Sequence, residues 1–184
     1  MTLALTETAF CFLRHGETDW NAKDLSQGNI DIPLNARGIA QAQEAAGKLA
    51  GRGIVSIVAS PLSRAHDTAN IVAAALGLTV SLDEGLREVS FGVQEGQPMG
   101  DWFSDWVDGH FTPQDGEPFA DLRERGVAAA NRALALPGPV LVVAHGALFR
   151  GLRGAMGLDP QFRTPNAQPV FCTPGHPSWT LAPL

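Results

Sequence analysis

Three short apolar runs, each followed by a helical pattern, constrain the fold of this chain more than any other feature. They occupy residues 10–13, 54–59 and 140–144. Their length suits buried strands, and strands that alternate with helices build a parallel sheet with helices on both faces. The sequence therefore predicts one α/β domain over residues 1–184, a three-layer α/β/α sandwich around a mostly parallel central sheet.

Further elements follow from the spacing of apolar residues. The helical segments are residues 37–51, 61–76 and 118–136. The weaker strand candidates are residues 78–82, 170–173 and 179–181, the last two as a closing hairpin or an edge pair. Within the single domain, residues 84–136 are expected to place a small helical cap over the strand ends.

Each of the three buried-strand patterns places an arginine or a histidine at its carboxyl end. Arg14 and His15 follow the first run, and His145 follows the third. After the second run, Ser60 suits the N-cap of a helix whose first turn contains Arg64. The carboxyl ends of parallel strands lie along one edge of a sheet, which is where open α/β sheets bind ligands. We therefore expect these four side chains, two arginines and two histidines, to converge.

These side chains suit phosphate chemistry. The planar fork of an arginine fits phosphate oxygens, and a neutral histidine can attack phosphorus when its other ring nitrogen donates to a backbone carbonyl. Glu88 lies in an apolar, glycine-bounded stretch between Leu86 and Phe91, where partial desolvation would favour a protonated carboxyl. Such a group can protonate a leaving alkoxide and then activate water. Glu95 is the rival carboxylate, and a solvated turn residue is its simpler interpretation.

A metal site built from the same residues is the competing interpretation. His15, His145 and Glu88 are residue types that bind zinc. Two arginines in the same pocket would repel a cation, and the sequence contains no HxH or HExxH pattern. We expect neither a metal nor a cofactor.

Several short blocks appear in order between residue 10 and about residue 158. They are Leu13-Arg14-His15-Gly16-Glu17-Thr18 with Trp20-Asn21, residues 27–35, Ser60-Pro61-Leu62-Ser63-Arg64-Ala65 with Thr68-Ala69, residues 86–96, Gly116-Glu117-Pro118 leading to Arg123 or Arg125, and Val143-Ala144-His145-Gly146. Together they resemble the histidine phosphatase superfamily, the phosphoglycerate mutase-like group. The resemblance implies a metal-independent phosphomonoesterase that hydrolyses a small phosphorylated metabolite through a phosphohistidine.

The resemblance also implies a role for each matching residue. His15 would be the nucleophile, and Arg14 and Arg64 would bind the oxygens of the transferring phosphoryl group. His145 would contact the same group and stabilise its charge. Glu88 would be the general acid.

Two amides are further candidates for substrate binding. Asn21 and Gln27 lie in the polar loop after the first strand, where their amide groups could donate to phosphate oxygens. The remaining histidines, His66, His110 and His176, lie outside the matching blocks and are expected to be surface or structural residues.

A mutase and a non-catalytic phosphate-binding module are the alternative functions. The phosphoglycerate mutases of this group carry a longer insertion, with tyrosine and lysine, between the acid and the second histidine. Here Glu88 and His145 are closely spaced, the chain contains no tyrosine, and Asn29 stands where such mutases usually carry tryptophan. These departures favour a phosphatase, and the presence of all five catalytic candidates disfavours a silent module. The substrate stays open among sugar phosphates, nucleotide-derived phosphates and phosphoproteins.

Composition bounds the partners and the compartment. The 184 residues carry a net charge of −6 without a basic stripe, which argues against nucleic acid and anionic membranes as partners. No segment has the length of a membrane span, and the N-terminus lacks the basic start of a secretory signal, so we expect a cytoplasmic enzyme. Cys11 and Cys172 are expected to be buried, reduced thiols. The sequence leaves the oligomeric state open.

Overall fold

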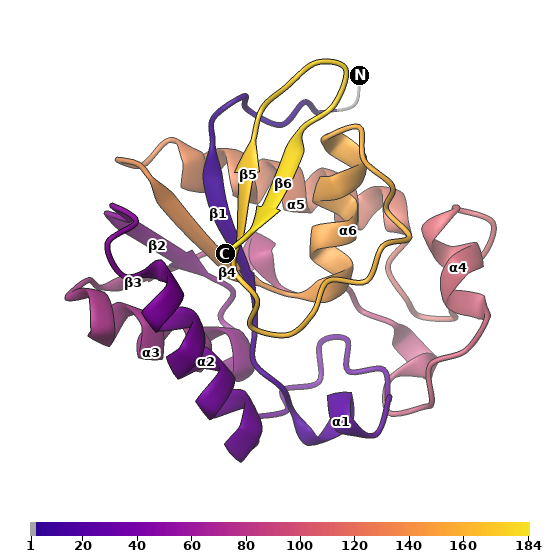
Figure 1. The fold of residues 1–184 in the computed structure, drawn as a ribbon. Helices are drawn as coiled ribbons and strands as arrows, with labels where there is room; N and C mark the ends of the chain where they lie inside the picture. Colours follow the sequence, from indigo (N-terminus) through magenta and orange to yellow (C-terminus); the bar gives the residue numbers. More distant parts are fainter. Residues whose placement is uncertain (1–2) are drawn as a thin grey trace.

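A six-stranded sheet forms the centre of the protein in a computed structural model that describes residues 3–184 (Figure 1). The strands are β1 (Phe10–Arg14), β2 (Ser56–Ala59), β3 (Val80–Leu82), β4 (Val140–Ala144), β5 (Val170–Thr173) and β6 (Thr180–Pro183). Their order across the sheet is β3-β2-β4-β1-β5-β6. The first four strands run parallel, whereas β5 pairs antiparallel with β1 and β6 pairs antiparallel with β5. The predicted mostly parallel sheet is confirmed, and the closing segments form an edge hairpin.

Helices cover both faces of this sheet. The α-helices are α1 (Asp19–Ala22), α2 (Ala36–Leu49), α3 (Ser63–Leu76), α4 (Trp102–Val107), α5 (Phe119–Leu134) and α6 (Gly146–Ala155), and the short 3₁₀ helices are η1 (Glu84–Leu86) and η2 (Gly92–Gln94). Helices α2 and α3 lie on one face, and α5 and α6 lie on the other (Figure 1). The predicted three-layer sandwich is confirmed. None of the helices in residues 3–184 is long and apolar enough to span a membrane.

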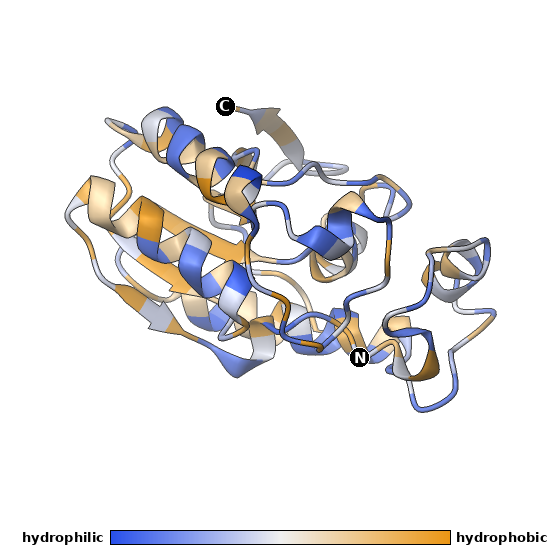
Figure 2. Ribbon diagram, turned by 90° about the horizontal axis from the view of Figure 1, so that it is seen from below, coloured by the Kyte–Doolittle hydropathy of each residue, from blue (hydrophilic) through white to orange (hydrophobic). Residues whose placement is uncertain are grey.

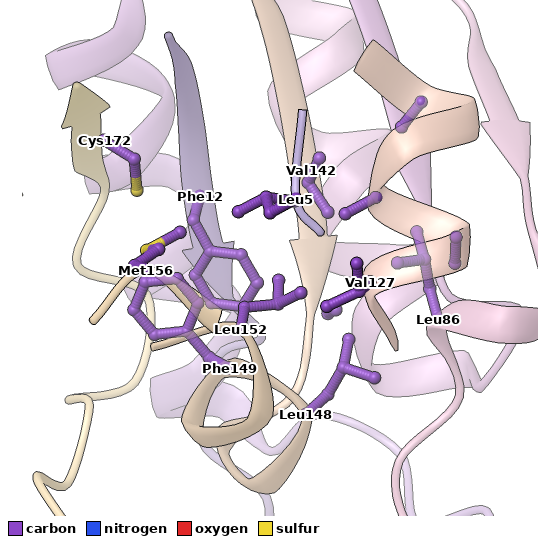
Figure 3. Close-up of a cluster of buried hydrophobic side chains, with 14 of the residues drawn as sticks. Leu5, Phe12, Leu86, Val127, Val142, Leu148, Phe149, Leu152, Met156 and Cys172 are labelled. Atoms are coloured by element: carbon purple, nitrogen blue, oxygen red, sulfur yellow. The ribbon is translucent and has the colours of Figure 1, made fainter. Parts of the chain in front are cut away.

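The two faces of the sheet contribute to two separate hydrophobic clusters, because successive side chains of a strand point to opposite faces. Phe10 and Phe12 of β1 belong to the cluster under α5 and α6, whereas Cys11 and Leu13 belong to the cluster under α2 and α3. On the first face the ring of Phe12 stacks on that of Phe149, with 3.9 Å between the ring centroids (Figure 3). Figure 2 shows that hydrophobic residues are concentrated in the strands, whereas the helices alternate hydrophobic and hydrophilic residues.

The two cysteines are buried and unpaired, as the sequence predicts. Burial raises the pKa of the Cys11 thiol to about 11, and it also raises the pKa of the Cys172 thiol. The two residues point into different clusters on opposite faces of the sheet. Both are therefore protonated, packing side chains at neutral pH.

One helix start differs from the prediction. Helix α3 begins at Ser63, its N-cap residue Leu62 makes no side-chain cap bond, and Ser60 lies before the helix. Ser60 instead accepts a hydrogen bond from the amide of Leu62 and contacts the ring of His145. The expected C-terminal stop is present at Gly77, which has the left-handed conformation that glycine adopts without strain.

Residues 84–136 contribute helix α5 to the sandwich and a group of aromatic residues that packs against the same buried cluster. Helix α5 packs on the sheet, in the same buried cluster as Phe12. Before it, an aromatic cluster gathers Phe91 of the turn before η2 and residues of α4, which projects from the side of the molecule (Figure 1). The members of this aromatic cluster are Phe91, Trp102, Phe103, Trp106 and Phe119. Glu88, Phe91, Met99 and Phe103 of this segment line the cavity described below, and the covering of a ligand by the segment stays a prediction.

Candidate active site

A cavity of about 180 Å³ lies at the carboxyl ends of the strands. Six of the residues that the sequence analysis singles out line it: Arg14, His15, Asn21, Gln27, Arg64 and Glu88. They come together because β4 lies between β1 and β2, with Arg14 opposite Ala144 in the register. The seventh candidate, His145, directly follows β4 and lies beneath this cavity rather than on its wall.

The imidazole of His15 is fixed in the arrangement that a nucleophile requires. Its Nδ1 lies 2.7 Å from the carbonyl oxygen of Gly16, which can only accept, so Nδ1 carries the proton. The Nε2 lone pair is then free. Burial, followed by the charges of Arg64 and Arg14, holds the pKa of His15 well below its usual value. The ring is therefore neutral at physiological pH.

The turn after His15 has no room for a side chain. A Cβ atom on Gly16 would overlap the carbonyl oxygen of Gly38 in the first turn of α2. The amide of Gly16 donates to the hydroxyl of Thr68 on α3, at 3.0 Å. Close packing of this turn between two helices explains why a glycine must follow the histidine, and it holds the carbonyl that orients the ring.

Backbone carbonyl groups orient the guanidinium groups of Arg14 and Arg64. Arg14 donates from Nη1 to the carbonyl of Thr164, at 2.7 Å. Arg64 donates to the carbonyls of Ile30 and Gly28, at 2.9 and 2.8 Å. Carbonyl partners fix the fork without neutralising its charge, and the Nε of each residue has no partner within residues 3–184. Both groups keep N–H donors for an anion in the cavity.

Burial makes these two charges costly without an anion. Arg14 is 9% exposed and Arg64 is fully buried. Burial lowers the pKa of Arg14 to about 10, and it also lowers the pKa of Arg64, while the charge of Glu88 opposes both effects. Neither arginine forms an ion pair within the described residues. A pair of buried, preorganised cations is the arrangement that a phosphate dianion compensates.

His145 lies behind His15, with 5.2 Å between the ring centroids. Its Nε2 lies 2.7 Å from the hydroxyl oxygen of Ser60, and its Nδ1 is buried without a partner in residues 3–184. Burial, followed by the charge of Arg64, lowers the pKa of His145 well below its usual value. This ring is also neutral, and its contact with a phosphoryl group stays a prediction.

Glu88 lines the cavity beside buried apolar residues, as expected, and it also has polar partners that the sequence did not predict. The residue is 8% exposed, and its carboxylate receives three backbone N–H groups. Oε1 accepts from Val89 and Leu148, at 3.1 and 2.9 Å, and Oε2 accepts from Ala147, at 2.9 Å. Two of the donors are at the N-terminus of α6, where the helix dipole favours negative charge. Oε2 accepts from one donor and Oε1 from two, so Oε2 is the oxygen with more capacity for a further hydrogen-bond partner.

The rival carboxylate, Glu95, serves a different purpose. Its Oε1 accepts from the amides of Asn29 and Phe91, at 2.9 and 3.1 Å, and it does not line the cavity. It joins two loops that border the site. Glu95 is thus half-buried and structural, neither a solvated turn residue nor the carboxylate nearest the chemistry.

Asn21 and Gln27 line the cavity, and their amide oxygens are occupied by other partners, so their amide nitrogens are the groups available to donate. The Asn21 oxygen accepts from the amide of Thr18, and the Gln27 oxygen accepts from the hydroxyl of Thr18, at 3.2 and 2.8 Å. The nitrogen of Asn166 adds a second donor to the Asn21 oxygen. Sequence reasoning missed Thr18 as the residue that orients both amides. Its capping-box spacing, with Asn21 three residues on, was the available signal.

The sequence matches the family model of the histidine phosphatase superfamily, branch 1, over residues 10–173. The chain belongs to this superfamily. It is 37% identical to the uncharacterized phosphatase PhoE of Bacillus subtilis over 161 residues, which cover 85% of this chain and 82% of PhoE. It is 39% identical to the probable phosphoglycerate mutase GpmB of Yersinia enterocolitica over 160 residues, 80% of this chain and 74% of GpmB.

Solved structures agree with this membership. The mycobacterial glucosyl-3-phosphoglycerate phosphatase superposes with a TM-score of 0.81 at 30% identity, covering 95% of this chain and 97% of that one. The resemblance that the sequence motifs indicate is thus confirmed at the level of the superfamily and its fold. Superfamily membership makes the chain a phosphoryl-transfer enzyme.

The sequence analysis did not identify two arginines of the site in this member of the superfamily. Arg150 and Arg163 line the same cavity as Arg14 and Arg64. Arg150 stands four residues after Gly146, which places both on one face of α6, so its position was available from helical spacing. Arg163 lies in an irregular loop without a local signal. The histidines His66, His110 and His176 do not line the cavity.

Proposed function

We propose that this histidine phosphatase superfamily member is a metal-independent phosphomonoesterase that hydrolyses a small phosphorylated metabolite through a phosphohistidine. The observation that carries the proposal is the free Nε2 of a neutral His15 beside the two carbonyl-held guanidinium groups of Arg14 and Arg64. Nucleophile and anion clamp share one small cavity at the end of the sheet.

In the first step, Nε2 of His15 attacks phosphorus in line with the leaving oxygen. The P–N bond forms as the P–O bond to the substrate alcohol breaks, and the leaving oxygen takes a proton from Glu88. Arg14 and Arg64 hold the non-bridging oxygens, where charge is spread in the transition state. The neutral amides of Asn21 and Gln27 add donors at the same group.

In the second step, the Glu88 carboxylate takes a proton from a water molecule, and the water oxygen attacks phosphorus. The P–N bond breaks, which returns neutral His15 and releases inorganic phosphate. Glu88 ends the cycle protonated, ready for the next leaving group. The three backbone donors stabilise its charged form between the two steps.

The size of the cavity supports a small substrate. About 180 Å³ is less than the roughly 300–1,000 Å³ of sites that hold drug-sized ligands. A phosphoryl group with a short alcohol fits such a space better than a nucleotide does. Because such metabolites are cytoplasmic, a cytoplasmic enzyme fits this proposal.

A phosphoglycerate mutase is the second candidate, and the likeness to GpmB favours it. A mutase must keep the phosphoryl group on histidine until it returns to substrate, so water must be excluded. In this chain the segment that can cover the cavity is the short stretch before α5, which favours hydrolysis.

The test is phosphate release from a panel of small phosphomonoesters in the presence of a chelator, with wild type and His15→Ala. The matched control is His66→Ala, a half-buried histidine of α3 outside the cavity. We expect turnover that survives the chelator, is lost in His15→Ala and is retained in His66→Ala. Acid-labile label on the quenched protein from a radiolabelled substrate would identify the phosphohistidine.

Two outcomes would contradict the proposal. Turnover that the chelator abolishes would show a metal-dependent reaction. Transfer of the label to phosphoglycerate faster than to water would identify the mutase.

A further inference from the structure

Four arginines line the cavity, two more than bind the phosphoryl group in the proposed function, together with the carboxyl groups of Glu88 and Asp24. Arg14 and Arg64 lie at the end where His15 attacks. Arg150 of α6 and Arg163 of the loop between α6 and β5 line the same cavity. We call Phe103, Arg150 and Arg163 the leaving-group end, and Arg14, His15 and Arg64 the phosphoryl end.

Arg150 is held in place without a counter-charge. Its Nη1 donates to the carbonyls of Pro160, at 3.0 Å, and Gln161, and its guanidinium carbon lies 4.8 Å from the ring centroid of Phe103. It forms no ion pair within residues 3–184, and its Nη2 has no hydrogen bond to that part of the chain. A half-buried, preorientated guanidinium with free donors is suited to bind an anion.

Arg163 adds a second cation at the rim. Its guanidinium lies 3.5 Å from the carboxylate of Asp24, and both side chains are mostly exposed. A long, solvated pair of this kind is weak, so Arg163 can turn to an incoming anion at little cost. The next residue, Thr164, supplies the carbonyl that holds Arg14, so one loop supports both ends of the cavity.

Helix α6 sets the order of groups along the cavity. Gly146 adjoins Arg14, since a Cβ atom there would lie 3.2 Å from the Arg14 Nε. The Glu88 carboxylate binds the amides of the first turn. Arg150 follows Gly146 by four residues, about 6 Å along the helix axis. A phosphoryl group at Arg14 therefore has the leaving oxygen near Glu88 and the far end of a short leaving group near Arg150.

We infer that the substrate is a short-chain phosphomonoester whose leaving group carries a second anion, a carboxylate or a further phosphate, bound by Arg150 and Arg163. The inference rests on the proposed function, because it identifies the phosphoryl end by His15. Phe91, Met99 and Phe103 supply apolar wall around this path, which suits a carbon chain better than a hydroxyl-rich sugar.

Substrate pairs that differ in the second anion test the inference. 3-Phosphoglycerate and glycerol 3-phosphate share the phosphorylated primary alcohol and differ in a carboxylate, and glycerol 1,3-bisphosphate tests a second phosphate. We expect wild type to prefer one anionic member of the set over glycerol 3-phosphate by about 100-fold in kcat/KM. The compound that is preferred then shows whether the second anion of the substrate is a carboxylate or a phosphate.

Variants assign the preference to the two arginines. Arg150→Gln and Arg163→Gln are each expected to lower the ratio of kcat/KM values between the preferred substrate and glycerol 3-phosphate by about tenfold. The matched control is Arg153→Gln, on the same helix but outside the cavity, where the ratio should stay unchanged. Arg163→Gln guards against misfolding, because its side chain is exposed and holds only Asp24.

Failure of the inference and failure of the proposed function give different results. Equal turnover of all three compounds, with ratios that the variants do not change, would overturn the second-anion site and leave the phosphatase standing. If wild type released no phosphate, calorimetric binding of the same three compounds would decide. Tighter binding of an anionic member that Arg150→Gln weakens supports the site, and equal binding overturns it.

Discussion

The two ends of the cavity are built in different ways. At the phosphoryl end, Arg14, His15 and Arg64 stand directly after or close to the ends of β1 and β2, and they are no more than 9% exposed. At the leaving-group end, Phe103 and Arg150 are half-buried on α4 and α6, and Arg163 is exposed in a loop. The reacting groups thus belong to the rigid frame of the sheet, whereas the groups that would select the substrate lie on elements that can vary without disturbing it.

The two ends of the cavity also differ in the free energy that a substitution is expected to cost. A buried guanidinium whose hydrogen bonds are all made with carbonyls leaves those carbonyls unpaired when it is removed, at a cost of about 1–3 kcal/mol for each. An exposed arginine leaves nothing buried behind. Changes at the phosphoryl end should therefore affect every substrate and the fold. At the leaving-group end, a change of the exposed Arg163 should affect discrimination alone, whereas a change of the half-buried Arg150 also removes its hydrogen bonds to the carbonyls of Pro160 and Gln161.

The largest effect is expected for Arg64→Met, which removes the fully buried charge at the phosphoryl end. We expect kcat/KM to fall by about 10³-fold for every phosphomonoester tested, because the clamp on the non-bridging oxygens is common to all of them. Steady-state kinetics on 3-phosphoglycerate and glycerol 3-phosphate, with circular dichroism to verify folding, would measure it. Arg37→Met, an exposed arginine of α2, is the control. If kcat/KM fell for only one of the two substrates, Arg64 would select the substrate, and the two ends of the cavity would not have separate roles.

The second effect is on stability, and it comes from the two neutral histidines at or beneath the phosphoryl end. Burial lowers the pKa of His15 and of His145 well below 6.5, so the unfolded chain binds more protons than the folded one. Above about pH 6.5 both histidines are neutral in the folded and in the unfolded chain, and they cost no stability. As the pH falls below that value, the histidines of the unfolded chain take up protons first, and the folded state loses stability. Each histidine should cost about 1.4 kcal/mol per pH unit in the free energy of unfolding.

Urea denaturation between about pH 7.5 and 5.5 would measure this loss. In His15→Asn one of the two histidines is gone, and the dependence on pH should be about half as steep. His176→Asn serves as the control, since its ring is exposed and pairs only with Glu7 at the surface. An unchanged slope in His15→Asn would show that this ring is not held neutral by its surroundings.

What the sequence could predict follows the same division. Arg14 and His15 stand at the end of an apolar run that the sequence identifies as a buried strand. Because the ends of parallel strands lie along one edge of a sheet, this pattern is enough to predict where the two side chains lie. Glu88 was predicted for the site from its block, but its partners come from α6, 59 and 60 residues further on. No local pattern reveals such partners, so the sequence predicted the burial of Glu88 beside apolar residues but not the backbone donors to its carboxylate.

Other residues were missed for related physical reasons. Serine is a residue type that favours the N-cap position, so the sequence assigned Ser60 to a helix start. Only the tertiary structure shows that its hydroxyl contacts His145. Arg163 and the carbonyls of residues 160, 161 and 164 act through an irregular loop whose path depends on α6 and β1. Groups that act through backbone carbonyls carry no side-chain signature at all.

The third prediction concerns Arg125, which we expect to position the acid. On α5 it pairs with both carboxylate oxygens of Glu117, at 2.9 and 2.7 Å, and donates to the carbonyls of Gly85 and Arg87, both at 2.9 Å. It therefore holds the backbone that leads into Glu88. Arg125→Gln should lower kcat by about 30-fold with a smaller change in KM, because a displaced acid weakens the transition state more than binding.

The pH profile separates positioning from a purely structural role. In Arg125→Gln the limb of the kcat profile that reports the acid should move, since the hydrogen bonds to Glu88 change with its backbone. Arg132→Gln is the matched control on the same helix, where the guanidinium pairs with Asp83 and lies away from the cavity. A profile of unchanged shape, with only a lower melting temperature, would reduce Arg125 to a structural residue.

The smallest effect is expected for Ser60→Ala, beneath the phosphoryl end. The Ser60 oxygen accepts from the amide of Leu62, at 3.3 Å, so its own proton is available to Nε2 of His145. A neutral His145 then carries its proton on Nδ1, the buried nitrogen without a partner in residues 3–184. Without the hydroxyl, the other tautomer becomes accessible, and we expect kcat to fall by about tenfold.

Nitrogen chemical shifts of the imidazole would report the tautomer directly, and kinetics would report its consequence. Ser63→Ala is the control, because that hydroxyl bonds Asp31 at the exposed start of α3. If the Nδ1–H tautomer persisted in Ser60→Ala and kcat still fell, Ser60 would act by holding the ring in position. If neither changed, His145 would owe its orientation to packing between the strand ends alone, and the phosphoryl end would be more tolerant of change than its burial implies.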